Sequence, residues 1–216
     1  MTDYRLHWFP QSGNAYKVAM YLDLVGSDWE PVVVDFFDGA TRAPEWRASI
    51  NEMGEVPVLE HDGHRLSQSG VILHYLADRI GRFGGATEEE KLEIWRWILF
   101  DNHKFTGSFA TYRWLRTFAR PAGRPGVIDF LRKRADAALA IVEKHLEGRQ
   151  FIVTTQPTIA DLSLAGYLYF PPEETGYDLP ATHPNIHAWT ERIAAMPGWR
   201  HPYDLSVSSR AKTPAM

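Results

Sequence analysis

Three polar side chains stand where strand-like segments give way to helical patterns, and their types suit the binding of an anion. Ser12 and Asn14 lie in the segment PQSGNAYKV, and Ser69 begins a second helical pattern. A helix N-terminus offers free amide groups and a partial positive charge, so it favours a carboxylate or a thiolate, and a serine hydroxyl adds a donor. Residues of this kind are also common helix caps, so a purely structural role stays open.

The composition narrows the chemistry further. The 216 residues include no cysteine, which excludes disulfide frameworks, thiolate metal sites and any mechanism with a protein thiol as nucleophile. A formal charge of -4 gives no basic surface for nucleic acid. No stretch approaches the roughly 18 apolar residues of a membrane span, and the N-terminus lacks a signal-like apolar core, so we expect no membrane association and a cytoplasmic location.

The histidines raise the question of a metal site. His183 and His187 have the i, i+4 spacing of two ligands on one helical face. No third ligand accompanies them at a recognisable spacing, and Pro184 indicates that a helix starts there instead. We therefore expect no metal.

The elements that must position these side chains alternate in the first part of the chain. Short runs rich in β-branched and aromatic residues predict strands, amphipathic runs predict helices, and Asp62-Gly63 is typical of a type I′ hairpin turn. The strand in WEPVVVDFF is expected to be buried. The predicted elements are strands over 4–9, 29–37 and the two arms around 62–63, with helices over 14–25, 44–50 and 69–80.

The second part of the chain has helical patterns throughout. Gly81, Gly84 and Gly85 indicate a linker over 81–87, which separates a domain over 1–80 from an all-helical domain over 88–216. Its helices are expected over 88 to about 119, over 125–146, from a cap at Thr158 with Asp161, and over 184–196. The polar residues 206–216 are expected to form a mobile tail.

This α/β thioredoxin-like order followed by an all-α domain, with GEVPVLEHDGHRLSQSGVILHYLA closing the first part, resembles the cytosolic glutathione transferase family, in its serine-type, bacterial-like branch. The resemblance covers nearly the whole chain. It implies glutathione as co-substrate and a cis bond before Pro57, so that the backbone of Val56 pairs with the cysteinyl residue of glutathione. It also implies that Gln68 and Ser69 hold the γ-glutamyl amine and carboxylate.

By the same resemblance Ser12, five residues before Lys17, donates its hydroxyl hydrogen bond to the glutathione sulfur, and Trp8 occupies the position of the tyrosine in other members. Lowering a thiol pKa from about 8.5 by about two units requires roughly 2.7 kcal/mol. One charge-assisted hydrogen bond of about 1.5 to 3 kcal/mol with a helix-end contribution of about 0.3 to 1 kcal/mol supplies that. Asn14 is the alternative donor.

The chain departs from the family at two positions. Asn51-Glu52 stands where members often have Asn-Pro, and Glu55 stands where a basic residue often meets the glycyl carboxylate of glutathione. A glutamate there is expected to repel that carboxylate. Arg42 matches a carboxylate-binding position of some relatives, and its planar guanidinium suits the task, although it could equally be plain surface charge.

The long helix carries the remaining candidates. Phe109 belongs to an aromatic stripe that is typical of a core, and the resemblance implies that part of the stripe lines the electrophile pocket, with Tyr112 and Arg113 as polar candidates. Asp101 resembles the acidic residue that reaches the glutathione amine of a partner subunit. A homodimer is therefore expected.

The resemblance implies a cytoplasmic detoxifying enzyme that presents the glutathione thiolate to a small-molecule electrophile or peroxide. Conjugation and the reduction of peroxides or disulfides both stay open. The alternative is a non-catalytic dimerisation or interaction module, which Glu52 and Glu55 favour. A cysteine-dependent thiol oxidoreductase is excluded unless glutathione supplies every thiol.

Overall fold

The computed structural model describes residues 3–206. Contacts between Cα atoms divide them into two compact units, one formed by residues 3–82 together with 196–206 and the other by residues 83–195. All but the first residue of the tail that was predicted over 206–216 lies outside the described residues.

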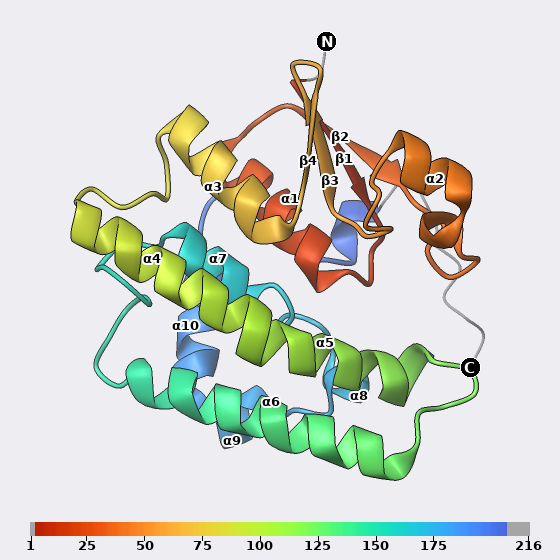
Figure 1. Cartoon of the computed structure of the whole chain (residues 1–216). Helices are drawn as coiled ribbons and strands as arrows, with labels where there is room; N and C mark the ends of the chain where they lie inside the picture. Colours follow the sequence, from red (N-terminus) through yellow and green to blue (C-terminus); the bar gives the residue numbers. More distant parts are fainter. Residues whose placement is uncertain (1–2, 207–216) are drawn as a thin grey trace. The chain divides into compact units, whose positions relative to one another are not determined.

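The first unit is built on a four-stranded mixed sheet in the order β2-β1-β3-β4. Strand β1 pairs in parallel with β2 and antiparallel with β3, which pairs antiparallel with β4, so the predicted α/β order is confirmed. Figure 1 shows α1 and α3 on one side of the sheet and α2 on the other. The elements are β1 (Tyr4–Trp8), α1 (Gly13–Val25), β2 (Trp29–Val33), η1 (Ala40–Arg42), α2 (Pro44–Ser49), β3 (Val58–His61), β4 (His64–Ser67) and α3 (Ser69–Ile80).

The hairpin between β3 and β4 turns as its sequence predicts. Asp62 and Gly63 have φ values of 48° and 76°, the positive pair that a type I′ turn requires. This turn aligns β4 so that the chain leaves the sheet at Ser67 and enters α3 two residues later.

Strand β2 corrects one expectation. It was predicted as a buried strand over 29–37, but it ends at Val33 and lies at the edge of the sheet, where Val33 is 44% exposed. The aromatic residues after it leave the sheet, and Phe36 stacks on Phe9 with ring centroids 4.3 Å apart. Their high strand propensity is overridden by this small aromatic cluster.

Residues 196–206 return to the first unit and pack on α1. The Tyr16 hydroxyl donates to the carbonyl oxygen of Arg200 at 2.8 Å, and the Arg200 guanidinium pairs with Asp23 at 2.6 Å. A Cβ atom on Gly198 would lie 2.5 Å from the Asp23 carbonyl oxygen, so only glycine allows this approach. Helix α1 is therefore buried on nearly all sides.

Glu60 connects three strands across the sheet surface. Its carboxylate lies 2.7 Å from Arg5 Nη1, 2.9 Å from Arg65 Nε and 3.2 Å from His7 Nε2. Partial burial acts to raise the pKa of Glu60, but the contact with His7, the hydrogen bond from Arg65 and the charge of Arg5 outweigh it and hold the pKa below its ordinary value. The carboxylate is thus a stabilising contact in its ionised form.

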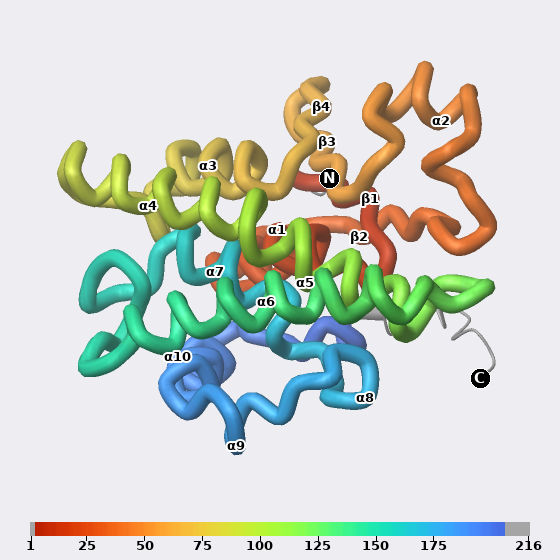
Figure 2. Tube along the Cα trace, turned by 60° about the horizontal axis from the view of Figure 1, so that its bottom comes forward, coloured from red at the N-terminus to blue at the C-terminus, as the bar shows by residue number. Residues whose placement is uncertain are grey.

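The second unit is helical, as predicted. One continuous helical run extends from Glu88 to Phe118, and Figure 2 shows α6 running beside it. Two segments of this run are π-helical, which no sequence pattern predicted. The elements are α4 (Glu88–Phe100), η2 (Asp101–Phe105), α5 (Thr106–Arg113), η3 (Trp114–Phe118), α6 (Pro125–His145), α7 (Ile159–Ala165), α8 (Pro172–Thr175), α9 (Leu179–Thr182) and α10 (Pro184–Ala194), and η4 (Asp204–Ser206) closes the first unit.

The capping box predicted at Thr158 and Asp161 is present and wholly buried. Asp161 accepts from the backbone amides of Ile152 at 2.8 Å and Thr158 at 2.7 Å, and from the indole Nε1 of Trp189 at 2.9 Å. Burial raises the pKa of the Asp161 carboxyl, and these hydrogen bonds oppose that rise. The side chain joins α7, the loop before it and α10.

Candidate active site

Ser12 is the N-cap of α1. Its hydroxyl oxygen accepts a hydrogen bond from the backbone amide of Ala15 at 3.1 Å, and the side chain is 5% exposed. Its hydroxyl hydrogen has no acceptor within residues 3–206. Because a hydroxyl can accept and donate at once, the capping role leaves the donor available.

Asn14 lies one residue into α1, at the same end of the helix as Ser12. Its Oδ1 atom is buried and has no partner among the residues that the structure describes. Trp8 ends β1 and is wholly buried, with its ring edge-on to Trp29 at 6.4 Å. Lys17, the basic residue five positions after Ser12, is also buried. The buried Oδ1 of Asn14 can only accept, so the candidate donors at the start of α1 are the Ser12 hydroxyl and the Asn14 Nδ2 group.

The peptide bond between Val56 and Pro57 is cis, as the resemblance to the family implies. Val56 is buried and lies two residues before β3, whose pairing with β1 and β4 begins at Val58. The backbone of Val56 is therefore outside the strand pairing of the sheet.

The loop before Val56 is held by Asn51. Its Nδ2 donates to the Glu55 carbonyl oxygen at 2.9 Å, and its Oδ1 accepts from the Met53 amide at 3.1 Å. Gly54 has a φ of 69°, and a Cβ atom there would lie 2.8 Å from the Thr41 carbonyl oxygen. The Asn51 side chain thus bridges the two ends of this loop, with Glu52 rather than a proline after it.

Gln68 and Ser69 stand together at the start of α3. Gln68 precedes the helix with a φ of 68°, and its Nε2 donates to Glu55 Oε2 at 2.9 Å and to Met53 Sδ at 3.3 Å. Ser69 is 5% exposed, and no hydrogen bond of its hydroxyl occurs within the described part of the chain. The first backbone bond of the helix joins the Ile72 amide to Gln68, which leaves the earlier amides for a ligand.

Two arginines lie near this loop. Arg42, the predicted carboxylate ligand, is exposed in η1, and its guanidinium lies against Gly39. Arg47 was not predicted, yet a Cβ atom on Gly54 would lie 2.9 Å from its Nη2. Because α2 has six residues, its sequence shows no helical period from which the direction of Arg47 could be read.

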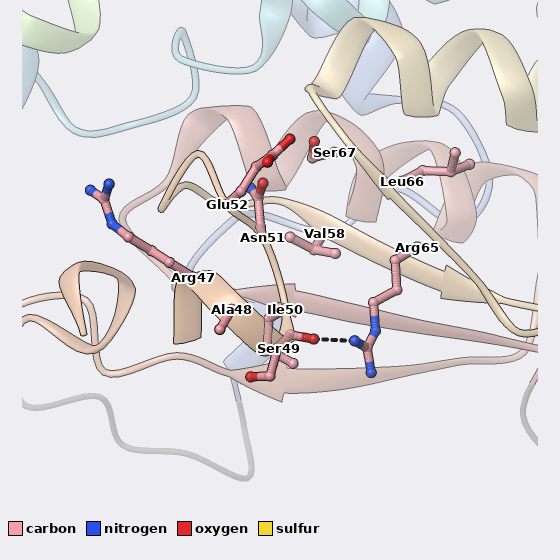
Figure 3. Close-up of a pocket in the computed structure, with 10 residues that line it drawn as sticks. All are labelled: Arg47, Ala48, Ser49, Ile50, Asn51, Glu52, Val58, Arg65, Leu66 and Ser67. Atoms are coloured by element: carbon pink, nitrogen blue, oxygen red, sulfur yellow. Dashed lines mark hydrogen bonds between the residues drawn. The ribbon is translucent and has the colours of Figure 1, made fainter. Parts of the chain in front are cut away.

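A polar cavity of about 310 Å³ lies beside the same loop (Figure 3). Across it the Arg65 guanidinium donates to the carbonyl oxygen of Ser49. It is lined by the end of α2, by the loop and by strands β3 and β4, through Arg47, Ala48, Ser49, Ile50, Asn51, Glu52, Val58, Arg65, Leu66 and Ser67. No sequence pattern predicted this cavity.

The candidates on α5 lie in the interior of the second unit. Phe109 is 1% exposed and stacks on Tyr177 with centroids 5.3 Å apart. The Tyr112 hydroxyl accepts from Arg132 Nη1 at 3.1 Å. Burial, with a hydrogen bond to Asp136, raises the pKa of Tyr177 well above its ordinary range. Both candidates therefore belong to an aromatic cluster around the Arg132 side chain.

Arg113 is 3% exposed and is committed to an ion pair with the Glu174 carboxylate. Its guanidinium also lies 3.8 Å from the ring centroid of Phe170. The pair connects α5 to α8 within the second unit.

Asp101 is wholly buried at the start of the first π-helical segment. Its carboxylate accepts from the hydroxyls of Thr106 at 2.6 Å and Ser163 at 2.5 Å. Among residues 3–206, no three histidine, aspartate or glutamate side chains are grouped as metal ligands. No helix in that part of the chain has the length and apolar character to cross a bilayer.

Comparison with known families gives two matches. The model described as "Glutathione S-transferase, N-terminal domain" matches residues 3–78, and the one described as "Glutathione S-transferase, C-terminal domain" matches residues 109–197. Glutathione S-transferase 3 of Zea mays is 28% identical over 212 residues, which cover 93% of each chain.

Two solved structures are similar over nearly their whole length. A possible glutathione S-transferase from Rhodopseudomonas palustris is 30% identical with a TM-score of 0.85, covering 93% of this chain and 98% of that one. A glutathione S-transferase from Xanthobacter autotrophicus Py2 is 32% identical with a TM-score of 0.83, covering 94% of this chain and 98% of that one.

Proposed function

The chain belongs to the glutathione S-transferase family, and from this premise we propose which of its residues perform the reaction of a glutathione transferase. One observation carries the proposal. The hydroxyls of Ser12 and Ser69 stand at the N-termini of two helices of the same unit, and neither hydroxyl hydrogen has an acceptor within the described residues. Each can therefore donate to an anionic group of glutathione.

At Ser12 the anionic group is the sulfur. The glutathione thiol releases its proton to solvent, and the thiolate accepts the Ser12 hydroxyl hydrogen bond at the positive end of α1. The thiolate electron pair then forms the new bond to the electrophilic carbon, and the leaving group departs with the electron pair of the broken bond. Asn14 is the second candidate donor, since its side chain lies at the same helix end.

At the start of α3 the anionic group is the γ-glutamyl carboxylate. The Ser69 hydroxyl and the first amides of α3 suit a carboxylate, and the side chain of Gln68 stands beside them for the amine. The backbone of Val56, outside the strand pairing, is proposed to pair with the cysteinyl residue. Arg42 is proposed for the glycyl carboxylate, and Arg47 joins it because its guanidinium lies beside Gly54.

The enzyme is proposed to act as a homodimer. Leu92 and Leu99 are exposed seven residues apart on α4, and Phe130 and Ile141 are exposed eleven residues apart on α6, so each pair lies on one face of its helix. These four residues are called the apolar stripe. A mostly apolar cavity of about 310 Å³ lies along it, between Phe100 and Ala137. Exposed apolar surface of this kind is typical of a protein interface.

In that dimer Asp101 was expected to reach the partner's glutathione. Its buried carboxylate accepts hydrogen bonds from Thr106 and Ser163, so we propose that it contacts the partner's glutathione through a bridging water or a neighbouring residue. A cytoplasmic, detoxifying role with a small-molecule electrophile accompanies the proposal, and reduction of peroxides or disulfides is proposed as a second use of the same thiolate.

Retention on immobilised glutathione, followed by turnover of a chromogenic electrophile and of a hydroperoxide, tests the proposed function. We expect retention and turnover of at least one substrate. Retention without any turnover would favour the non-catalytic module, and a protein that neither binds nor turns over would reject the assignment of the site.

A further inference from the structure

We propose that Glu55 supplies the negative charge that binds the ammonium group of the γ-glutamyl residue, and that it also fixes the orientation of Gln68. The inference rests on the proposed glutathione site and deepens it. It assigns to Glu55 a specificity-determining role in place of the repulsion that its charge suggests from sequence alone.

Glu55 determines how the Gln68 amide is oriented. Its Nε2 donates to Glu55 Oε2 at 2.9 Å and to Met53 Sδ at 3.3 Å, which uses both hydrogens of the amide. Its Oε1 has no donor within the described residues. The opposite amide orientation would place Oε1 against the Glu55 carboxylate, so Glu55 keeps the Gln68 acceptor turned toward the ligand.

Glu55 and Gln68 together present hydrogen-bond acceptors to a ligand. A carboxylate and an amide oxygen are acceptors, and an ammonium group is a donor in all three of its N–H bonds. The pair Glu55 and Gln68 therefore suits an ammonium group and disfavours a carboxylate. Ser69, the next residue, offers a hydroxyl and helix amides, which suit a carboxylate.

The γ-glutamyl end of glutathione matches this arrangement of acceptors and donors. The α-carbon of a γ-glutamyl residue carries an ammonium and a carboxylate side by side, and the chain presents an acceptor pair and a donor group in adjacent positions. Gln68 is neutral, and Glu55 is the carboxylate that lies against its side chain and adds a formal negative charge to the pair. Placing opposite charges together strengthens such hydrogen bonds.

The expected clash with the glycyl carboxylate is not supported by the placement of Glu55. Its carboxylate is directed at Gln68 and the start of α3, where the γ-glutamyl end is proposed to lie. The Arg47 guanidinium lies against Gly54 in the same loop. The chain is therefore predicted to select thiols with a free γ-glutamyl amino group over analogues in which that group is absent.

The test uses the full chain, isothermal titration calorimetry and two probes. One probe is S-methylglutathione, and the other is S-methylated glutaryl-cysteinyl-glycine, which lacks only the amino group. In the Glu55→Gln variant we expect the Kd of S-methylglutathione to rise by about threefold to tenfold, or about 0.7 to 1.4 kcal/mol. The Kd of the second probe should stay unchanged or fall.

Glu52→Gln is the matched control. It removes the same charge from the same exposed loop, and no hydrogen bond joins Glu52 to Gln68 within residues 3–206. We expect its Kd values for both probes to equal those of the unsubstituted chain.

A charge exchange makes the test sharper. Gln68→Glu alone places two carboxylates where a 2.9 Å hydrogen bond exists now, and it should weaken binding or destabilise the loop. The double variant Glu55→Gln with Gln68→Glu rebuilds the pair with its members exchanged and should recover the binding of S-methylglutathione that Glu55→Gln loses.

Three results would overturn the inference. Glu55→Gln could bind S-methylglutathione as tightly as the unsubstituted chain, or more tightly, or it could weaken both probes by the same factor. If the unsubstituted chain binds S-methylglutathione, any of these results rejects the proposed role of Glu55 but leaves the proposed glutathione site in place. If it binds neither probe, the proposed glutathione site fails together with the inference.

Discussion

The Ser12 hydroxyl oxygen accepts from the Ala15 backbone amide at 3.1 Å, so the proposed sulfur ligand is also the cap of α1. The two roles use different parts of one group, because the cap needs an acceptor and the thiolate needs a donor. Substitutions at this position can therefore separate stability from catalysis.

Ser12→Ala removes both roles. We expect turnover to fall tenfold or more, about 1.4 kcal/mol, and the free energy of unfolding to fall by about 0.5 to 2 kcal/mol. Ser12→Asp keeps a good cap but offers no donor and places a negative charge near the sulfur. In urea unfolding this variant should be as stable as the unsubstituted chain. It should lose turnover, and the ultraviolet absorbance of the bound thiolate should disappear with it. An unchanged Ser12→Ala turnover would move the role to Asn14.

Ser69→Ala is expected to act on binding alone. Since the hydroxyl has no hydrogen bond within the described residues, its loss should leave the melting temperature unchanged. The KM for glutathione should rise by about threefold to tenfold, as for the loss of one hydrogen bond of about 1 kcal/mol. A lower melting temperature with an unchanged KM would instead indicate a structural role.

Arg113→Met leaves the Glu174 carboxylate without its partner in a largely buried position. We expect the free energy of unfolding to fall by about 3 kcal/mol. The double variant with Glu174→Gln should recover most of this loss in urea unfolding. If Arg113 also contacts the electrophile, the double variant will show a raised KM for that substrate while it remains stable.

Glu60→Gln tests the electrostatics of the sheet. Because the folded-state pKa of Glu60 is lowered from its ordinary value of 4.5, the carboxylate stabilises the fold above that pH and loses its contribution as the pH falls through the lowered pKa. The variant should be less stable by about 1 kcal/mol at neutral pH, since its arginine partners are half exposed. Urea unfolding in acid should show no difference. A difference that persists at low pH would contradict this origin.

Phe130→Glu places a charge in the exposed apolar stripe of α4 and α6, where Phe130 is 60% exposed. If this face is the dimer interface, sedimentation should show a monomer, whereas Phe130→Leu should retain the dimer. A dimer that survives Phe130→Glu would place the interface elsewhere.

The elements bounded by strong local signals could be predicted from the sequence. Asp62-Gly63 determines the hairpin, and Gly81, with a φ of 74°, ends α3 at the predicted residue. The end of β2 could not be predicted, because Phe36 has a high strand propensity and leaves the sheet only through its contact with Phe9. Local pattern gives the type of an element, whereas a distant contact decides where it stops.

The same distinction between local signals and distant contacts applies to the site. Ser12 and Ser69 stand at helix starts that the sequence shows. The contact between Glu55 and Gln68 spans the whole β3–β4 hairpin and depends on how the chain before β3 lies against the end of β4. The Arg113 pair joins residues 61 positions apart. Charge alone could not tell whether Glu55 faces a ligand carboxylate or a neighbouring amide.

The return of residues 196–206 to α1 affects how the chain can be synthesised and dissected. Because Arg200 binds Asp23 and Tyr16, the first unit is incomplete while the ribosome is still translating the helical unit. More than a hundred further residues must be synthesised after residue 82 before the segment that completes the cover of α1 is available. A fragment cut after residue 82 would therefore expose one flank of α1, whereas a fusion of 1–82 to 196–206 through a short linker would restore its cover.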